Sequence, residues 1–461
     1  FFHFTNPTEL ILPLTVTFII SALITGIIRV LLLYTTTRFS YATGADLALD
    51  VYRRTLYQEY SEHLAQNSSE IINSITVKTH TIIAGMLNPS LIFISSLILI
   101  VITSSTLFFI DPTVTLISFF FFGLFYLSII IYTHRKLRES SESIAKESSK
   151  IIKAVQEGLG GIRDVIIDGN QEFYSKIYRK SDIPLRKALG YIQFINGSPR
   201  YIMESIGMIL IAGIAYFMSL QEAGLSAVIP VLGALALGAQ RILPALQQLY
   251  GAYTSIKSAK SSFIDVLNLL EQPLPRNNSL LTSSPIIFKK NIHINNISFK
   301  YSGTKKEVLK NISLNIPKGS ITGFIGTTGS GKSTLLDIVM GLLTQTSGDI
   351  KIDNIKIDNS NQQLWRNNIA HVPQSVFLSD ASIRENIAFG VPINEIIQDR
   401  VENAAKQSQL DELIDGLPEK YETHVGERGV RLSGGQLQRL GIARALYKRA
   451  TVLVFDEATS A

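Results

Sequence analysis

The stretch Gly326–Thr334, which reads GTTGSGKST, decides how the second half of the chain folds. It fits the phosphate-binding pattern G-x-x-x-x-G-K-[ST] and lies between two apolar runs, Ile321–Ile325 and Leu335–Leu343. This order predicts a strand, a glycine loop and a helix that begins near Lys332. Glycines let the loop backbone approach a polyanion closely, and the helix start adds its positive dipole end. We therefore expect a nucleotide phosphate site rather than a flexible glycine turn.

Within this loop we expect Lys332 to reach the β- and γ-phosphates of the nucleotide and Ser333 to be a ligand of Mg²⁺. The residues predicted to hold the nucleotide are Gly326, Thr327, Thr328, Gly329, Ser330, Gly331, Lys332, Ser333 and Thr334.

The composition indicates a chain that is half membrane protein and half soluble protein. Of its 461 residues, 46% are hydrophobic and only 17% are charged, against about 25% charged in a typical soluble protein. The net charge of +6 is better explained by basic cytoplasmic loops than by nucleic-acid binding. The sequence contains no cysteine, which excludes disulfides and thiolate metal sites within it.

Five apolar stretches are long enough to span a bilayer. Lys and Arg collect in the long connections Arg38–Thr81 and His134–Arg200, which are therefore predicted to be cytoplasmic. Because an odd number of spans is unusual for a chain with a cytoplasmic C-terminal half, we expect a further span upstream. The sequence opens with Phe-Phe-His and stops abruptly at Ser460-Ala461, so we expect a chain trimmed at both ends. The predicted spans are Leu10–Tyr34, Leu91–Ile110, Thr113–Tyr132, Tyr201–Leu220 and Leu225–Leu246.

These observations predict three parts. Residues 1–270 form an all-α transmembrane domain with long cytoplasmic helical extensions, and residues 271–285, rich in Pro, Asn and Ser, form a linker. Residues 286–461 alternate strand-like and helix-like segments, which is typical of an α/β sheet.

Four further features accompany the loop in the α/β part. Tyr301 could stack on adenine, although alone it reads as an ordinary strand tyrosine. Gln374 ends a short predicted strand, Ile369–Gln374, with an amide oxygen suited to Mg²⁺ or to a water near the γ-phosphate. Leu432–Gln436, LSGGQ, opens a helix and predicts a second anion site, or else a plain capping turn. A strand predicted to be buried then ends in Asp456, suited to hold Mg²⁺, and Glu457, suited to polarise the attacking water.

The order and spacing of these motifs resemble the ATP-binding cassette (ABC) transporters over the whole chain. The resemblance implies an exporter-type half-transporter, with an α/β P-loop cassette that has a helical subdomain and is incomplete at its C-terminal end. It implies ATP and Mg²⁺ as cofactors. It implies that each ATP lies between Gly326–Ser333 of one copy and Ser433–Gln436 of a second copy. By this resemblance the catalytic residues are Glu457, Lys332 and Gln374, the Mg²⁺ ligands are Ser333, Gln374 and Asp456, and the further nucleotide contacts are Tyr301, Ser433, Gly434, Gly435 and Gln436.

Two departures from the family pattern stand out. The switch histidine would lie beyond Ala461, and the aspartate of the loop after Glu457 is absent. We therefore expect this chain as given to bind nucleotide poorly and to hydrolyse little. The resemblance also implies short transverse helices, near Gln58–Asn67 and Asp168–Tyr174, that press into a groove between Gln374 and Leu432.

The substrate is read from fewer residues. Arg241 lies within the last span, where it either meets an anionic head group or leaves the membrane at the helix end. Asn196–Glu204 and Leu335–Leu343 are most similar to the lipid-linked oligosaccharide flippases. We therefore expect a flippase of lipid-linked oligosaccharides or envelope lipids in a bacterial inner membrane, with membrane lipids and no nucleic acid as partners. The alternatives are an exporter of peptides, drugs or lipid A-like lipids, and an ATP-gated channel or regulator.

Overall fold

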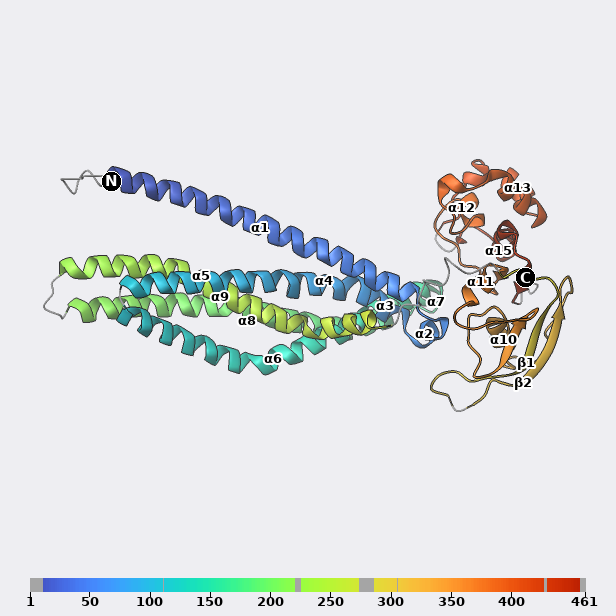
Figure 1. The fold of residues 1–461 in the computed structure, drawn as a ribbon, viewed down its shortest axis with the longest axis horizontal. Helices are drawn as coiled ribbons and strands as arrows, with labels where there is room; N and C mark the ends of the chain where they lie inside the picture. The colour runs from blue at the N-terminus through green and yellow to red at the C-terminus, as the bar shows by residue number, and fades with distance from the viewer. Residues whose placement is uncertain are drawn as a thin grey trace. The chain divides into compact units, whose positions relative to one another are not determined.

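The computed structural model describes residues 11–110, 112–219, 225–272, 286–304, 306–426 and 429–456. The chain divides into two units (Figure 1). The helical unit comprises residues 1–58 and 66–274, and the α/β unit comprises residues 59–65 and 275–461. The expected linker, residues 271–285, lies outside the described residues from position 273 onward.

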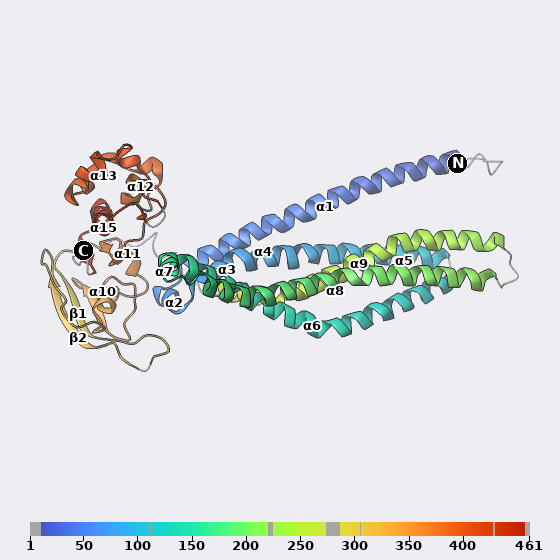
Figure 2. The same ribbon diagram turned by 180° about the vertical axis from the view of Figure 1, so that it is seen from behind.

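The helical unit is built from long helices that run alongside one another, while α1 leans away toward its N-terminal end (Figures 1 and 2). Two short π-helical segments, η2 and η3, interrupt the run of helix between α3 and α5. The elements are α1 (Ile11–Leu56), α3 (Ser68–Asn73), η2 (Ser74–Lys78), α4 (Thr79–Ile82), η3 (Ile83–Leu87), α5 (Asn88–Ile110), α6 (Pro112–Gly160), α7 (Ile162–Ile167), α8 (Gln171–Ser219) and α9 (Leu225–Leu270).

The helix breaks fall at proline and glycine residues. Pro112 opens α6, a position that tolerates its missing N–H. Gly161 separates α6 from α7, and the turn before α8 contains Gly169 at φ +67°. Helix α9 continues past Leu246, the end of the last predicted span, to Leu270. Asp111 and residues 221–224, which connect predicted spans, lie outside the described residues.

Within the described ranges, two helical stretches are long and apolar enough to cross a membrane, Ile11–Leu56 and Ser68–Phe109. Two of the other predicted spans fall within α6 and α9, and the span Tyr201–Leu220 lies in α8 as far as Ser219, the last residue described there. Side chains from α6, α8 and α9 form a buried cluster that includes Tyr126, Met203 and Tyr250. The predicted spans are therefore helical where they are described.

The α/β unit contains a four-stranded antiparallel sheet, order β2-β1-β3-β4, and a parallel pair, β5 and β6. Its main core includes Ile294, Ile338, Ile352 and Trp365, all at most 1% exposed. The parallel pair brings the ends of β5 and β6 together, which positions the predicted Mg²⁺ residues. The strands are β1 (Asn291–Phe299), β2 (Leu309–Pro317), β3 (Ser347–Ile352), β4 (Ile355–Lys356), β5 (Ile369–Val372) and β6 (Val452–Phe455).

Two strand predictions need correction. Ile321–Ile325 forms no strand, and Ile321 and Ile325 are fully exposed, because among the described residues no strand pairs with this segment. The strand at Thr451–Asp456 is present as β6 but is not buried as a whole: Leu453 is 43% and Phe455 47% exposed, and Val454 alone is buried. A parallel strand is fully buried only when other elements cover both faces of its sheet.

A second core holds the helices between Gln374 and the chain's last helix together. It includes Ile387, Val401, Ala405, Leu440 and Ala443, and it gives the α/β unit a helical subdomain. The helices of the unit are α2 (Tyr60–Ala65), α10 (Lys332–Val339), α11 (Gln362–Arg366), α12 (Ile383–Ile387), the 3₁₀ turn η5 (Ile393–Glu395), α13 (Gln398–Gln407), α14 (Asp411–Asp415), the 3₁₀ turn η6 (Lys420–Glu422) and α15 (Gly434–Lys448).

Candidate nucleotide site

The glycine loop has the backbone geometry that its sequence predicts. Gly329 and Gly331 have φ of +79° and +93°, a region that side chains rarely adopt. A Cβ on Gly331 would lie 2.8 Å from Leu309 Cδ2 and 3.2 Å from Val308 Cγ1. Glycine is therefore required at this position by both the backbone and the packing against the chain before β2.

Lys332, the first residue of α10, folds back over the loop. Its Nζ donates to the carbonyl oxygens of Gly326 at 2.7 Å and Thr327 at 3.1 Å. An ammonium held only by exposed carbonyls is free to exchange them for a phosphate, which pairs with it more strongly. The position fits the predicted role of Lys332.

Ser333 and Asp456 meet although 123 positions separate them in the sequence. The Asp456 N–H donates to the Val372 carbonyl at 3.0 Å, which ties the end of β6 to β5. The Ser333 hydroxyl donates to Asp456 Oδ1 at 3.4 Å. Gln374 follows β5 by two residues and is exposed. A hydroxyl and a carboxylate side by side are oxygen ligands that suit Mg²⁺, so the residues present fit the predicted ion.

Tyr301 is linked to the P-loop helix. Its hydroxyl lies 3.0 Å from Thr334 Oγ1, and its ring packs edge-on against Phe299 with centroids 5.0 Å apart. Thr334 is buried, so this contact holds the Tyr301 side chain in place beside the P-loop. Stacking of Tyr301 on adenine stays a prediction.

Asp337 is a site residue that the sequence reading missed. It lies one helical turn beyond Ser333, and burial raises the pKa of its carboxyl to about 6, with the Asp456 carboxylate adding to the rise. The i, i+4 spacing from Ser333 was the signal that could have found it, because it places both side chains on one face of α10.

The LSGGQ segment forms a capped helix start. The Ser433 side chain accepts from the Gln436 N–H, and the Ser433 N–H donates to Gln436 Oε1 at 2.8 Å. Gly434 and Gly435 begin α15, and a Cβ on either would meet nothing within 4 Å. The helix therefore begins at Gly434, within the LSGGQ segment that was predicted to open it. Glu457 lies outside the described residues.

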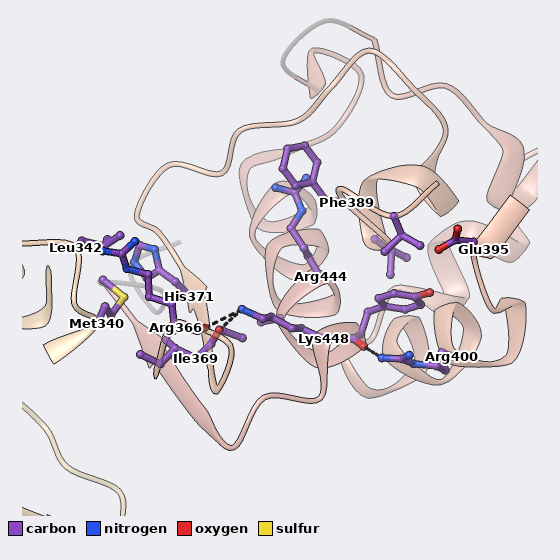
Figure 3. A pocket seen from close by; sticks show the side chains of 15 residues that line it. Met340, Leu342, Arg366, Ile369, His371, Phe389, Glu395, Arg400, Arg444 and Lys448 are labelled. Atoms are coloured by element: carbon purple, nitrogen blue, oxygen red, sulfur yellow. Dashed lines mark hydrogen bonds between the residues drawn. The ribbon is translucent and has the colours of Figure 1, made fainter. Parts of the chain in front are cut away.

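A groove of about 600 Å³ lies between the main core and the helical subdomain (Figure 3). Four cationic side chains line it, and each donates to a backbone carbonyl. Arg444 also packs over the Phe389 ring, and Arg400 over the Tyr447 ring. In the part of the chain that the structure describes, none of the four forms an ion pair with a carboxylate. The cationic residues are Arg366, Arg400, Arg444 and Lys448.

Comparison with protein families agrees with the motifs. The family described as "ABC transporter" matches residues 309–460, and the family described as "ABC transporter transmembrane region" matches residues 4–222. The first match covers the P-loop, LSGGQ and Asp456. The second covers four of the five predicted spans.

The chain also resembles individual proteins. It is 30% identical over 438 residues to a Bacillus subtilis (strain 168) protein with the provisional name multidrug export ATP-binding/permease protein YgaD, covering 93% of this chain and 73% of that protein. A protein of Staphylococcus aureus (strain NCTC 8325 / PS 47) with a similar provisional name is 30% identical over 407 residues, covering 87% of this chain and 68% of that protein. A solved structure of a bacterial Atm1-family ABC exporter with ATP bound superposes with a TM-score of 0.77 at 23% identity, covering 92% of this chain and 74% of that one.

Proposed function

Because the chain belongs to the ABC transporter family, we propose that it is an exporter-type half-transporter that uses ATP to move an amphipathic compound across a membrane. Its helical part matches the transmembrane region of that family, and its α/β part is an ABC ATPase domain, which implies ATP binding. The proposal of direction and of a bacterial inner membrane is supported by the bacterial relatives, whose provisional names are those of export proteins.

We propose that the working form is a dimer in which each ATP lies between the P-loop of one copy and LSGGQ of the other. The observation that carries this is the contrast between two sets of glycines. Gly331 is required by its own chain, whereas Gly434 and Gly435 begin a right-handed helix with open space around them. Glycine at these two positions is explained if a second copy brings a nucleotide against the N–H groups of α15.

Within that site the chain's own residues have distinct tasks. Lys332 and the loop N–H groups hold the phosphates, and the paired oxygens of Ser333 and Asp456, with the Gln374 amide, would hold Mg²⁺. The ion supplies neutralisation of the phosphate charge. Glu457 accepts a proton from the attacking water and orients it. In the described part of the chain no three His, Asp or Glu side chains gather to bind a metal without phosphate, so the ion is expected to arrive with ATP.

The relatives support a different substrate class from the one that the flippase resemblance implied. The relatives compared carry provisional multidrug-export names, which support the alternative of a drug or peptide exporter over lipid-linked oligosaccharides. Arg241, exposed on α9, remains a candidate contact for an anionic head group. We propose a hydrophobic or amphipathic compound as the substrate class.

The test is transport into liposomes by the full-length protein. Cationic drugs, lipid A-like lipids, peptides and lipid-linked sugars are each presented with ATP, and a Glu457→Gln protein is the control. ATP-dependent uptake of one class that stops in the control supports the proposal. Flux that continues in Glu457→Gln would instead indicate a channel that ATP gates, and an absence of flux for every class would contradict export of amphipathic compounds.

A further inference from the structure

Helix α10, which follows the P-loop, ends in a turn that directs the Gly341 carbonyl toward α11. The Leu342 N–H donates to the Asp337 carbonyl at 2.8 Å and the Gly341 N–H to that of Ile338 at 3.0 Å, the two bonds of a Schellman motif. Gly341 has φ of +69°. Its own carbonyl is left outside the helix.

Two side chains from the last turn of α11 hold this end of α10. The Trp365 Nε1–H, fully buried, donates to the Val339 carbonyl at 2.8 Å. The Arg366 guanidinium donates from Nε and Nη2 to the Gly341 carbonyl at 2.9 and 2.5 Å. A positive charge at the C-terminal end of a helix also complements the helix dipole. These three hydrogen bonds therefore hold the end of α10 that lies opposite the P-loop, about 12 Å from Lys332.

Arg366 also lines the groove. It lies there beside Met340 and Leu342, which follow α10 directly, and its carbonyl accepts from Lys448 Nζ at 3.2 Å (Figure 3). The guanidinium thus contacts the end of the P-loop helix and the wall of the groove at once. The other groove cations do not: Arg400 donates to the Tyr447 carbonyl, and Arg444 donates to those of Asn386 and Phe377.

The Arg366 guanidinium also donates to Gln362 Oε1 at 3.1 Å and interacts electrostatically with a carboxylate. Burial lowers its pKa, and the Glu59 carboxylate opposes that effect. Glu59 begins the segment 59–65, which belongs to the α/β unit although α1 and α3 on either side belong to the helical unit. The carboxylate that acts on Arg366 therefore comes from the segment that connects α1 to α3.

We propose that Arg366 is a positioning residue of the ATPase: by holding the Gly341 carbonyl it sets the P-loop helix from its far end and links the groove to ATP turnover. The proposal rests on the ATPase function. The guanidinium does not touch nucleotide. It acts through α10, whose first residues are Lys332 and Ser333.

The test compares Arg366→Ala and Arg366→Lys with Arg400→Ala in the full-length protein in liposomes. Arg400→Ala removes the same charge from the same groove without touching α10. We expect Arg366→Ala to raise the KM for ATP or lower kcat so that kcat/KM falls about tenfold, the factor that one lost charge-assisted hydrogen bond represents. Arg366→Lys keeps the charge and one donor nitrogen, so its kcat/KM should lie between those of wild type and Arg366→Ala. Ethylguanidinium added to Arg366→Ala should restore part of the loss.

A second readout does not need activity. Amide hydrogen exchange in α10 without nucleotide should speed up in Arg366→Ala and not in Arg400→Ala. If wild-type protein had no ATPase activity, the proposed function would fail, while this exchange result would still decide the role of Arg366. The proposal is overturned by unchanged exchange and turnover, by an equal loss in Arg400→Ala, or by a lowered melting temperature with no rescue by ethylguanidinium.

Discussion

Helices α10 and α15 begin in opposite ways, although both were predicted as anion sites. The N-cap of α10 is Gly331, which has no side chain to satisfy the helix N–H groups. The N-cap of α15 is Ser433, whose side chain and N–H are both engaged by Gln436 in a capping box. A start without a cap leaves its N–H donors for a ligand, whereas a capped start is stable by itself. The start of α10 therefore has open N–H donors that suit a phosphate, and the capped start of α15 fits our proposal that LSGGQ contacts the nucleotide of another chain.

The largest expected effect is that of Lys332→Ala in the full-length dimer. The ammonium now rests on two loop carbonyls, and its removal takes the charge that would stabilise the transferring phosphate. We expect ATPase activity and transport to fall by at least about a hundredfold. Phosphate release is the measurement, and Lys310→Ala, exposed on β2, is the control. Turnover unchanged from wild type would remove the P-loop from the mechanism.

The glycines of the two helix starts should respond differently to alanine. Gly331→Ala forces a side chain into a left-handed backbone and against Leu309, which should cost about 2–4 kcal/mol of stability. Gly434→Ala meets open space and, as a helix residue, should leave stability unchanged or raise it by up to about 1 kcal/mol.

Melting temperatures measure these stability changes, and ATPase assays complete the comparison. Both variants should lose ATPase activity, Gly331→Ala with lower stability and Gly434→Ala without it. Full activity in a well-folded Gly434→Ala protein would contradict the role given to LSGGQ.

Two capping boxes allow a smaller test. Ser433→Ala and Ser382→Ala each remove a serine cap, at α15 and α12, and each should cost about 1 kcal/mol of stability. Only Ser433 belongs to the predicted nucleotide contacts, so only Ser433→Ala should also reduce ATPase activity. Thermal melts and phosphate release on both proteins measure the difference. An equal activity loss in the two variants would mean that the cap acts through stability alone.

Asp337 gives a pH-dependent test of the P-loop side. Its folded pKa of about 6 lies above the ordinary value, so its carboxyl favours folding at low pH and loses that contribution as the pH rises through 6. Asp337→Asn should therefore be more stable than wild type at pH 7.5 by about 1 kcal/mol, after allowance for solvent screening. The difference should shrink as the pH falls to 4. Melts without nucleotide and Mg²⁺ measure it, and a difference independent of pH would exclude this cause.

The sequence predicted the parts of the site that local pattern determines. The P-loop, the helix after it, the capped start at LSGGQ and the strand that leads to Asp456 all follow from residue type and spacing. The helix breaks at Gly161 and Gly169 do as well.

Features that depend on neighbours far along the chain were not predictable. The apolar run Ile321–Ile325 reads as a strand, but a strand forms only where another strand pairs with it. The hydrogen bond from Arg366 to the Gly341 carbonyl joins α11 to the end of α10, and no sequence motif marks this pair of residues. The raised pKa of Asp337 depends on burial, which the sequence does not show.

The central claim, that the P-loop and LSGGQ of different copies share one ATP, is tested most directly by cross-linking. The sequence contains no cysteine, so Ser330→Cys and Gly435→Cys chains, each also carrying Glu457→Gln to retain ATP, can be mixed without background from the printed residues. The account predicts a disulfide-linked dimer that forms with ATP and Mg²⁺ only when both variants are present. It is contradicted if no linked dimer forms with ATP while a single chain carrying both cysteines closes an internal disulfide.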